Sequence, residues 1–415
     1  MYRVWFSTDS FADFIIDNTL LSKQNVSKRK LYESDANNPK NFHTMPDHIR
    51  KILYLDAPDL IVEKDNEPVF SIEVTTEAGT GHNAFQRFAR IAAAVENNVP
   101  AFYIYPEGKI IQRKNSPTRW DLINPLIFNA LEAAMSVHNI PSLLYYFPTD
   151  NIAHYKTKPH TAPHINTAGL CFDSNIVKYS GCPDSKTKSM QDMFQAINEI
   201  INETNNKGVI PARSSLLQNL VIRKQRNYMA SEYSKKAGNK LDIDMSPLSA
   251  AIFVPTQYLL NYLSKYHTNG YKIGELLRSR DLTYLYQIDA KFRGDPYPGC
   301  LAAIDYLTCR QGPTFEDRKH NLVMVWGKIG VDHCKKTIAI NSTKSTISDF
   351  FSEVKKCSNH NLLTKDYNQL GFDQISRYFM QIRYGSTYSK VKHIRVYSYF
   401  ADAILFPDGS LWRDA

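Results

Sequence analysis

The clearest hydrophobic pattern in the chain lies between Pro58 and Pro106. A short apolar run is followed by a polar turn and then by a stretch in which apolar and polar positions alternate, which is the period of a strand. Gly79 and Gly81 break this period, and apolar residues then recur at helical spacing until Asn97. A compact apolar run closes the stretch. The predicted order is strand, turn, strand, helix and strand, at 60–62, 64–68, 69–75, 83–96 and 101–105.

The pattern elsewhere predicts an α/β chain of several parts. An alternating stretch typical of an edge strand is expected at 2–7, whereas the strongly polar residues 24–40 are expected to form a loop or irregular helix. Further strands are predicted at 322–326, 336–340, 392–399 and 403–406. Further helices are predicted at 11–21, 46–54, 125–137, 189–203, 211–237, 247–266, 273–286, 346–356 and 370–383.

Composition changes along the chain suggest where domains begin and end. Prolines and histidines crowd the region between Pro148 and Thr187, which has few periodic apolar residues and is typical of a connection. We therefore predict a first α/β domain, a linker or long loop, a mainly helical segment and a C-terminal α/β domain, over residues 1–150, 151–188, 189–290 and 291–415.

Composition and charge narrow the class of protein. The sequence has no apolar run of eighteen residues, and its first residues carry acids where a signal peptide would be apolar, so a cytoplasmic protein is expected. The 50 Lys and Arg against 41 Asp and Glu give a net charge of +9, which is compatible with a polyanionic partner. The six cysteines are scattered without a Cys-x-x-Cys pair and are interpreted as reduced structural thiols, with a zinc site formed by Cys171, Cys182 and neighbouring histidines as an alternative.

Two carboxylates fall at meaningful places on the predicted hairpin. Asp59 opens the first strand after Pro58, and Glu73 lies late in the second strand. A hairpin can bring both side chains to one end of a sheet, where paired oxygen ligands suit Mg²⁺. Such an ion can activate a water and stabilise charge on a phosphodiester. The sequence thus predicts Asp59 and Glu73 as ligands of Mg²⁺.

This pattern resembles the PD-(D/E)xK nuclease superfamily, to which many restriction endonucleases belong. Pro58-Asp59 is followed after thirteen residues by Glu73-Val74-Thr75, and of the chain's Pro-Asp pairs it alone precedes such a hairpin, helix and strand. The resemblance covers about fifty of the 415 residues. It implies a restriction-endonuclease-like mixed sheet flanked by helices.

The sequence departs from the family at Thr75, which stands where the motif has lysine. The lysine would orient the attacking water and balance charge, and a threonine hydroxyl can do only the first. Candidates to compensate are Lys64 on the preceding turn, and Gln86 or Arg90, which share a helix face. Further acids were considered at Glu77, and at Glu33 or Asp47, of which Asp47 fits a helix start better.

The resemblance implies a Mg²⁺-dependent endonuclease that cuts double-stranded DNA and leaves 5′-phosphates, with a type II restriction endonuclease as the favoured kind. Many such enzymes are homodimers, because twofold protein symmetry matches twofold DNA symmetry. Two alternatives stay open. One is a sequence-specific DNA-binding protein whose nuclease core has decayed, and the other is an RNA-directed or structure-specific nuclease.

A basic helix is the predicted DNA contact. Residues 209–240 hold seven Lys or Arg against one acid, with amides and tyrosines between them. Lys and Arg can hold phosphates while Arg, Gln and Asn can read base edges, although an ordinary solvated helix face explains the pattern equally well. The candidates are Arg223, Lys224, Gln225, Arg226, Asn227, Lys235 and Lys236.

Charged residues beside Gly and Pro turns mark residues 291–330. Asp305, Arg310 and Arg318 are among them. Packing such groups together predicts a polar network or a second functional surface.

Overall fold

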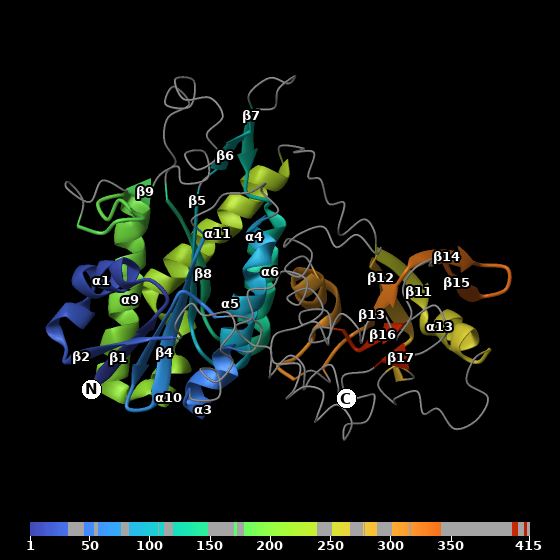
Figure 1. Ribbon diagram of the computed structural model, residues 1–415, viewed down its shortest axis with the longest axis horizontal. Helices are drawn as coiled ribbons and strands as arrows, with labels where there is room; N and C mark the ends of the chain where they lie inside the picture. Colours follow the sequence, from blue (N-terminus) through green and yellow to red (C-terminus); the bar gives the residue numbers. More distant parts are fainter. Residues whose placement is uncertain are drawn as a thin grey trace. The chain divides into compact units, whose positions relative to one another are not determined.

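The computed structural model divides into two compact units, which are described separately (Figure 1). Unit 1 comprises Met1–Ser34 and Met45–Ile243, and unit 2 comprises Asp35–Thr44 and Asp244–Ala415. The structure describes residues 1–31, 45–53, 57–75, 83–106, 108–111, 119–147, 170–171, 178–238, 251–265, 277, 279–288, 301–314, 317–341, 401–405 and 411–412.

Unit 1 is built on a six-stranded mixed sheet in the order β2-β1-β3-β4-β5-β8. The strands are β1 (Tyr2–Phe6), β2 (Val26–Lys30), β3 (Leu60–Lys64), β4 (Glu67–Val74), β5 (Ala101–Pro106) and β8 (Ser142–Phe147). β3 is antiparallel to β1 and β4, whereas β4, β5 and β8 are parallel. β5 and β8 are buried along their whole length, as parallel strands covered on both faces must be. The mixed α/β class predicted from the sequence is confirmed.

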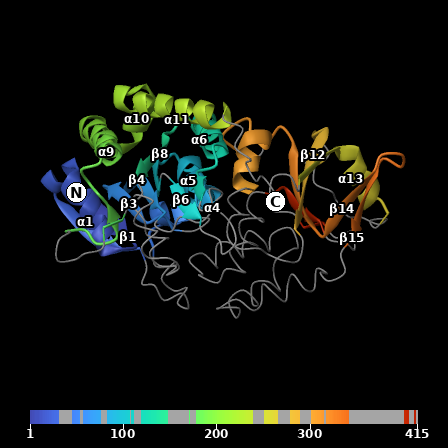
Figure 2. The ribbon, with the colours of Figure 1, turned by 90° about the horizontal axis from the view of Figure 1, so that it is seen from above.

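Helices cover both faces of this sheet. They are α1 (Asp9–Asn18), α3 (Asp47–Arg50), α4 (Asn83–Gln86), α5 (Phe88–Glu96), α6 (Leu126–His138), α9 (Lys188–Lys207), α10 (Val209–Arg213) and α11 (Leu220–Gly238). α5 contacts β4 and β5 and α6 contacts β8, while α9 and α10 both contact β4. Figure 2 shows α9 and α10 on one side of the strands and α4 and α5 on the other. The predicted hairpin, helix and strand over 60–105 are therefore present in the expected order.

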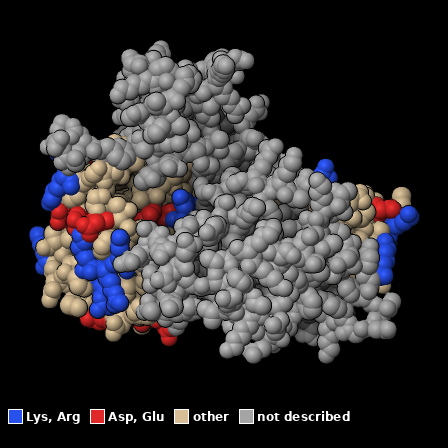
Figure 3. Space-filling model, viewed as in Figure 1, with Lys and Arg blue, Asp and Glu red and all other residues tan. Residues whose placement is uncertain are grey.

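The two edges of the sheet are protected differently. β2 forms one edge and pairs with β1, so β1 is not the edge strand that its alternation predicts, and 26–30 is not loop. Lys28, Arg29 and Lys30 of β2 are exposed, and Lys28 pairs with Asp9 and Asp13 of α1. Figure 3 shows Lys and Arg beside Asp and Glu on this part of unit 1. Lysine-rich edges discourage pairing with another chain.

At the other edge, α11 covers β8. Met229 Sδ accepts a hydrogen bond from Leu144 N at 3.3 Å, and Gln225 Nε2 donates to Leu144 O at 2.5 Å. These contacts satisfy backbone groups that a bare edge would leave open.

The predicted domain division is wrong after residue 150. α9, α10 and α11 pack on the sheet of unit 1, so residues 189–238 belong to the first domain and not to a separate helical segment. The structure divides near 244 instead. The helix predicted over 247–266 is confirmed for Thr256–Leu263, but Ala251–Pro255 is a strand, and Leu282–Ile288 is a strand where the end of the helix predicted over 273–286 was expected. Apolar periodicity showed that these helices bury one face, but it does not identify the surface that covers it.

Unit 2 has a five-stranded mixed sheet in the order β11-β12-β13-β16-β17. Its strands are β11 (Ala251–Pro255), β12 (Leu282–Ile288), β13 (Asn321–Trp326), β16 (Ala403–Leu405) and β17 (Leu411–Trp412). Helix α13 (Thr256–Leu263) packs against a hairpin of β14 (Lys328–Asp332) and β15 (Thr337–Asn341). A C-terminal α/β unit was predicted, and the strands expected at 322–326, 336–340 and 403–406 are present within two residues.

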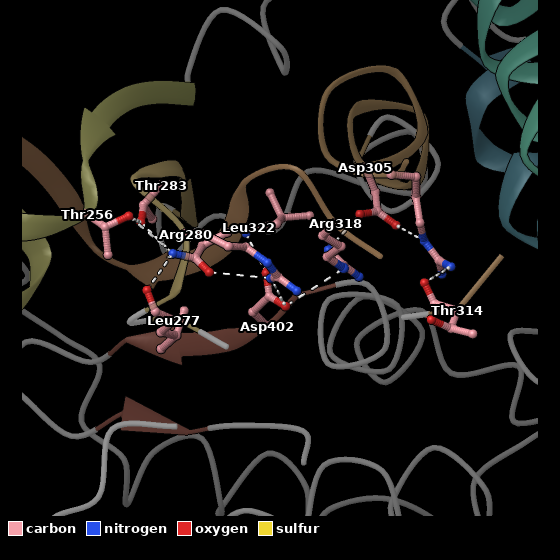
Figure 4. A network of polar contacts seen from close by, with 11 residues as sticks. Thr256, Leu277, Arg280, Thr283, Asp305, Thr314, Arg318, Leu322 and Asp402 are labelled. Carbon is pink, nitrogen blue, oxygen red and sulfur yellow. Dashed lines mark hydrogen bonds and ion pairs between the residues drawn. The ribbon is translucent and has the colours of Figure 1, made fainter. Parts of the chain in front are cut away.

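A buried polar network lies in unit 2 (Figure 4). A polar network was predicted from the charged residues of 291–330. Asp402 contacts Arg280 at 3.0 Å and Arg318 at 3.7 Å, and accepts a hydrogen bond from Leu322 N at 2.7 Å. Asp305 is entirely buried and pairs with Arg318 at 2.6 Å and Arg310 at 3.4 Å. Nearby, burial raises the pKa of the Cys309 thiol to about 12.

Smaller elements complete the description. β6 (Gly108–Ile111) and β7 (Arg119–Leu122) form an antiparallel pair, and β9 (Leu170–Cys171) pairs with β10 (Cys182–Pro183). The predicted elements at 346–356, 370–383 and 392–399 lie outside the described residues, as do Glu33 and Glu77. Asp47 begins α3, as its helix-start interpretation expects. In the described part of the chain, no helix combines the length and apolarity needed to cross a bilayer.

Candidate active site

Asp59 and Glu73 come together at one end of the unit 1 sheet. β3 and β4 pair with Leu60 opposite Ile72, so the hairpin register brings Asp59 level with Glu73. Asp59 Oδ2 accepts a hydrogen bond from Val74 N at 2.8 Å, and Ser7 N donates to Asp59 O at 2.9 Å. These contacts tie Asp59 to the strands on both sides of it.

Two arginines hold the Glu73 carboxylate. Glu73 is 1% exposed, and Arg90 Nη1 donates to both of its oxygens, at 2.7 and 2.9 Å. Arg87 Nε lies 3.3 Å from Glu73 Oε1. Arg90, one of the residues expected to compensate for the missing lysine, therefore contacts the predicted site directly. A buried carboxylate with this many charged neighbours is held in one orientation.

Charge on Glu73 is incompletely compensated. Burial raises the pKa of Glu73 to about 8, with Arg90 and Arg87 opposing this shift and Asp59 adding to it by repulsion. The effect of Asp59 shows that the two carboxylates are close enough to influence each other. A buried acid with a raised pKa beside a second acid is common in sites that bind cations or transfer protons.

The raised pKa predicts that Glu73 makes unit 1 less stable as pH rises. Between about pH 4.5 and pH 8 the unfolded chain releases this proton while the folded chain retains it, so the free energy of unfolding falls through this window. Compared with Glu73→Gln, the free energy of unfolding of the wild type should fall by about 1 kcal/mol per pH unit within this window. Above about pH 8 it should fall no further relative to the variant. Urea unfolding of both proteins from pH 5 to pH 9 measures this. Parallel curves for the two proteins would contradict the prediction.

Thr75 occupies the position of the family lysine and is buried. Its Oγ1 lies 3.1 Å from the hydroxyl of Tyr103, which donates in turn to Ala84 O at 3.1 Å. Because the Tyr103 proton is used on Ala84, Thr75 must be the donor of the first bond. Thr75 therefore keeps only acceptor lone pairs for any other partner.

The remaining candidate substitutes for lysine fare differently. The prediction that Lys64 replaces the missing lysine is wrong. Lys64 is the last residue of β3, whereas Asp59 precedes the first, and at the rise of a strand the two are about 17 Å apart. Its Nζ instead donates to Asn205 at 2.9 Å and lies over the ring of Tyr2. Gln86 is the last residue of α4, one turn before Arg90.

Sequence reasoning missed Arg87 and Tyr103. Arg87 precedes α5 and lies three positions before Arg90, a spacing that puts both on one side of the helix. This signal was available in the sequence. Tyr103 was not recognisable, because only the β4–β5 register brings it beside Glu73.

The donor set suits a hard divalent cation. Mg²⁺ is usually held by one or two carboxylates with waters filling its other positions, and Asp59 and Glu73 supply two. A cation between them would lower the cost of the charge on Glu73, provided that Arg90 gives up part of its contact. No cluster of three or more His, Cys, Asp and Glu suited to a metal is present among the described residues.

The predicted DNA-binding residues of α11 divide into structural and exposed ones. Gln225 is wrong as a base reader, because it is 8% exposed and its amide is used on β8. Arg226 forms a bidentate pair with Glu132 of α6, which fixes it to the protein. The other candidates with described side chains are exposed, and of these Lys235 pairs with Glu232: Arg223, Lys224, Asn227 and Lys235. Lys236 lies in the last turns of α11.

The alternative zinc site finds no support within the described residues. Cys171 and Cys182 are opposite each other in the β9–β10 pair, and Cys182 is buried. The histidines considered with them, at 154, 160 and 164, lie outside the described residues.

Comparison of the chain with protein-family models, with curated proteins and with solved structures found no match.

Proposed function

We propose that this chain is a Mg²⁺-dependent endonuclease that hydrolyses phosphodiester bonds of double-stranded DNA, of the type II restriction endonuclease kind. The observation that carries the proposal is the meeting of Asp59 and Glu73 at one sheet end, with Val74 N bonded to Asp59. The strand, helix and strand that follow agree with the order expected of the PD-(D/E)xK superfamily.

Asp59 and Glu73 would hold the ion, which would supply an activated water and charge stabilisation at the phosphate. Arg90 and Arg87 keep Glu73 in one orientation and bring positive charge to the place where the lysine is missing. A guanidinium does not act as a base, so these arginines contribute charge and position only. Thr75 could accept a hydrogen bond from a water near Glu73.

Basic residues at the same sheet end favour a polyanionic substrate. Lys30 is opposite Phe6, and Phe6 is opposite Leu60, so the basic run of β2 ends two strands away from the start of β3. At the usual spacing of strands this is about 10 Å. A DNA backbone near Asp59 would pass within reach of these cations.

The direct test is digestion of a plasmid by the purified protein. With Mg²⁺ we expect discrete fragments with 5′-phosphates, and with EDTA none. Sequencing the fragment ends would give the recognition site, and a palindromic site together with a dimer in sedimentation would support the twofold assembly. Preference for RNA, flaps or single strands would replace duplex DNA as the substrate, and a protein that cuts no nucleic acid is not an endonuclease.

A DNA-binding protein without activity is the second candidate. It is favoured by two observations, the threonine at position 75 and the engagement of both Glu73 oxygens by Arg90. Retention of a specific DNA site in a gel-shift experiment, with no cleavage under any divalent cation, would select this candidate.

A further inference from the structure

A cavity in unit 1 lies at the β8 edge of the sheet and is lined by neither Asp59 nor Glu73. It has a volume of about 300 Å³ and is enclosed by the outer edge of β8 and by helices α9 and α11. This volume is at the small end of ligand sites and exceeds that of a nucleobase. The cavity belongs to no part of the acidic site.

One wall of the cavity is aromatic. Tyr145 and Tyr146 come from β8, and Tyr228 from α11. Tyr228 is 43% exposed, so part of its ring is open to solvent. Tyr145 is 1% exposed, and its buried hydroxyl has no hydrogen-bond partner within the described residues. A buried polar group of this kind lacks the compensation that a ligand could supply.

The other wall is cationic and polar. Lys188 and Ser189 come from the first turn of α9, a twenty-residue helix whose N-cap Thr187 makes no side-chain capping bond. The N-terminus of a helix favours negative charge, because its first backbone N–H groups point outward. Lys224 is exposed at the same cavity and forms no ion pair with any described residue, while Lys188 pairs with Asp192.

We propose that this cavity binds one nucleotide, with its base against the exposed ring of Tyr228 and its phosphate at Lys224 and the N-terminus of α9. Stacking on aromatic rings beside lysines is the usual chemistry of nucleotide recognition. The nucleotide could be free in solution or part of a DNA strand. A DNA strand at the acidic site would pass near the cavity. Tyr145 of the cavity is level with Val74, which follows Glu73, and lies two strands away, about 10 Å across the sheet.

Binding is measured directly, by isothermal titration calorimetry of the full chain in EDTA. The probes are the four deoxynucleoside monophosphates, deoxyribose 5-phosphate and a short single-stranded oligonucleotide. Because no cleavage occurs in EDTA, the outcome is independent of the proposed nuclease activity. We expect saturable binding of a nucleotide or of the oligonucleotide, and weaker binding of the sugar phosphate.

Two exposed residues test the assignment without disturbing the core. Tyr228→Ala and Lys224→Ala should each weaken binding about tenfold or more, the loss expected when a stacking ring or a phosphate contact is removed. Tyr228→Phe keeps the ring and should bind as the wild type does. Lys207→Ala, at the other end of α9 and outside the cavity, is the matched charge control.

Each result decides the matter. Saturable binding of free nucleotides that both variants weaken identifies a free-nucleotide site, and binding of the oligonucleotide alone with the same sensitivity identifies a nucleotide of a strand. The proposal is overturned by absence of saturable binding, by binding that either alanine variant leaves unchanged, or by deoxyribose phosphate that binds as tightly as the nucleotides.

Discussion

Asp59→Asn and Glu73→Gln are each expected to reduce plasmid cleavage by about 10³-fold or more. The reason is that a metal ion contributes several kcal/mol of stabilisation to the charge of the transition state, and each 1.4 kcal/mol changes a rate about tenfold. Asparagine still offers an oxygen to Val74 N, so the hairpin contact of Asp59 can persist in the variant. The measurement is the rate of loss of supercoiled plasmid under single-turnover conditions with Mg²⁺.

Two matched controls on the same hairpin separate charge from chemistry. Asp65→Asn changes an exposed acid in the β3–β4 turn, where φ is 54° and asparagine is also tolerated. Glu67→Gln changes an acid on β4, at the end away from the site. Both should cut at the wild-type rate. If Asp59→Asn and Glu73→Gln, shown by circular dichroism to be folded, also cut at that rate, these acids are not the metal ligands.

Asp402→Ala is expected to destabilise unit 2 by about 3–5 kcal/mol, the usual cost of removing one partner from a buried ion pair. The aspartate is 1% exposed, and its loss would leave the buried guanidinium of Arg280 without this partner and Leu322 N without its acceptor. Arg318, which lies between Asp402 and Asp305, would lose one of its two carboxylates.

The loss of stability is measured by chemical denaturation, with hydrogen exchange of the amides of β12 and β13 as the probe of unit 2. Asp332→Asn is the control, since that side chain is 37% exposed and asparagine retains an acceptor for Lys335 N, so a change within about 0.5 kcal/mol is expected. Should Asp402→Ala cost no more than this control, the network contributes little to stability.

Hydrophobic periodicity located the elements around the site but not all of their partners. The strand over 69–75 and the helix after Asn83 were predicted correctly, although β4 is buried on both faces and its polar residues Ser71 and Glu73 lie inside the protein. The position of Lys64 depends on the length of β3, which carries it to the far end of the sheet. The run from Val26 to Lys30 has no apolar period because it forms an edge, so its pairing with β1 leaves no local signal.

Side chains used for packing were the other source of error. Gln225 and Arg226 stand in a basic helix and look suited to DNA, yet they fasten α11 to β8 and α6. A shift of one position along a helix changes whether a side chain faces the protein or solvent. Composition does not predict which of the two it faces. The carboxylate pair was predictable because a hairpin restricts its own register.

The treatment of the two sheet edges limits how two copies of this chain can associate. Gln225 and Met229 occupy the outward backbone groups of Leu144, so a second molecule finds no open strand at β8. A copy approaching β2 would bring its own Arg29 and Lys30 against the same two cations, whereas Lys28 pairs with Asp9 and Asp13. A continuous intermolecular sheet is therefore disfavoured at both borders, and any twofold complex on DNA must be joined through helices, loops or unit 2.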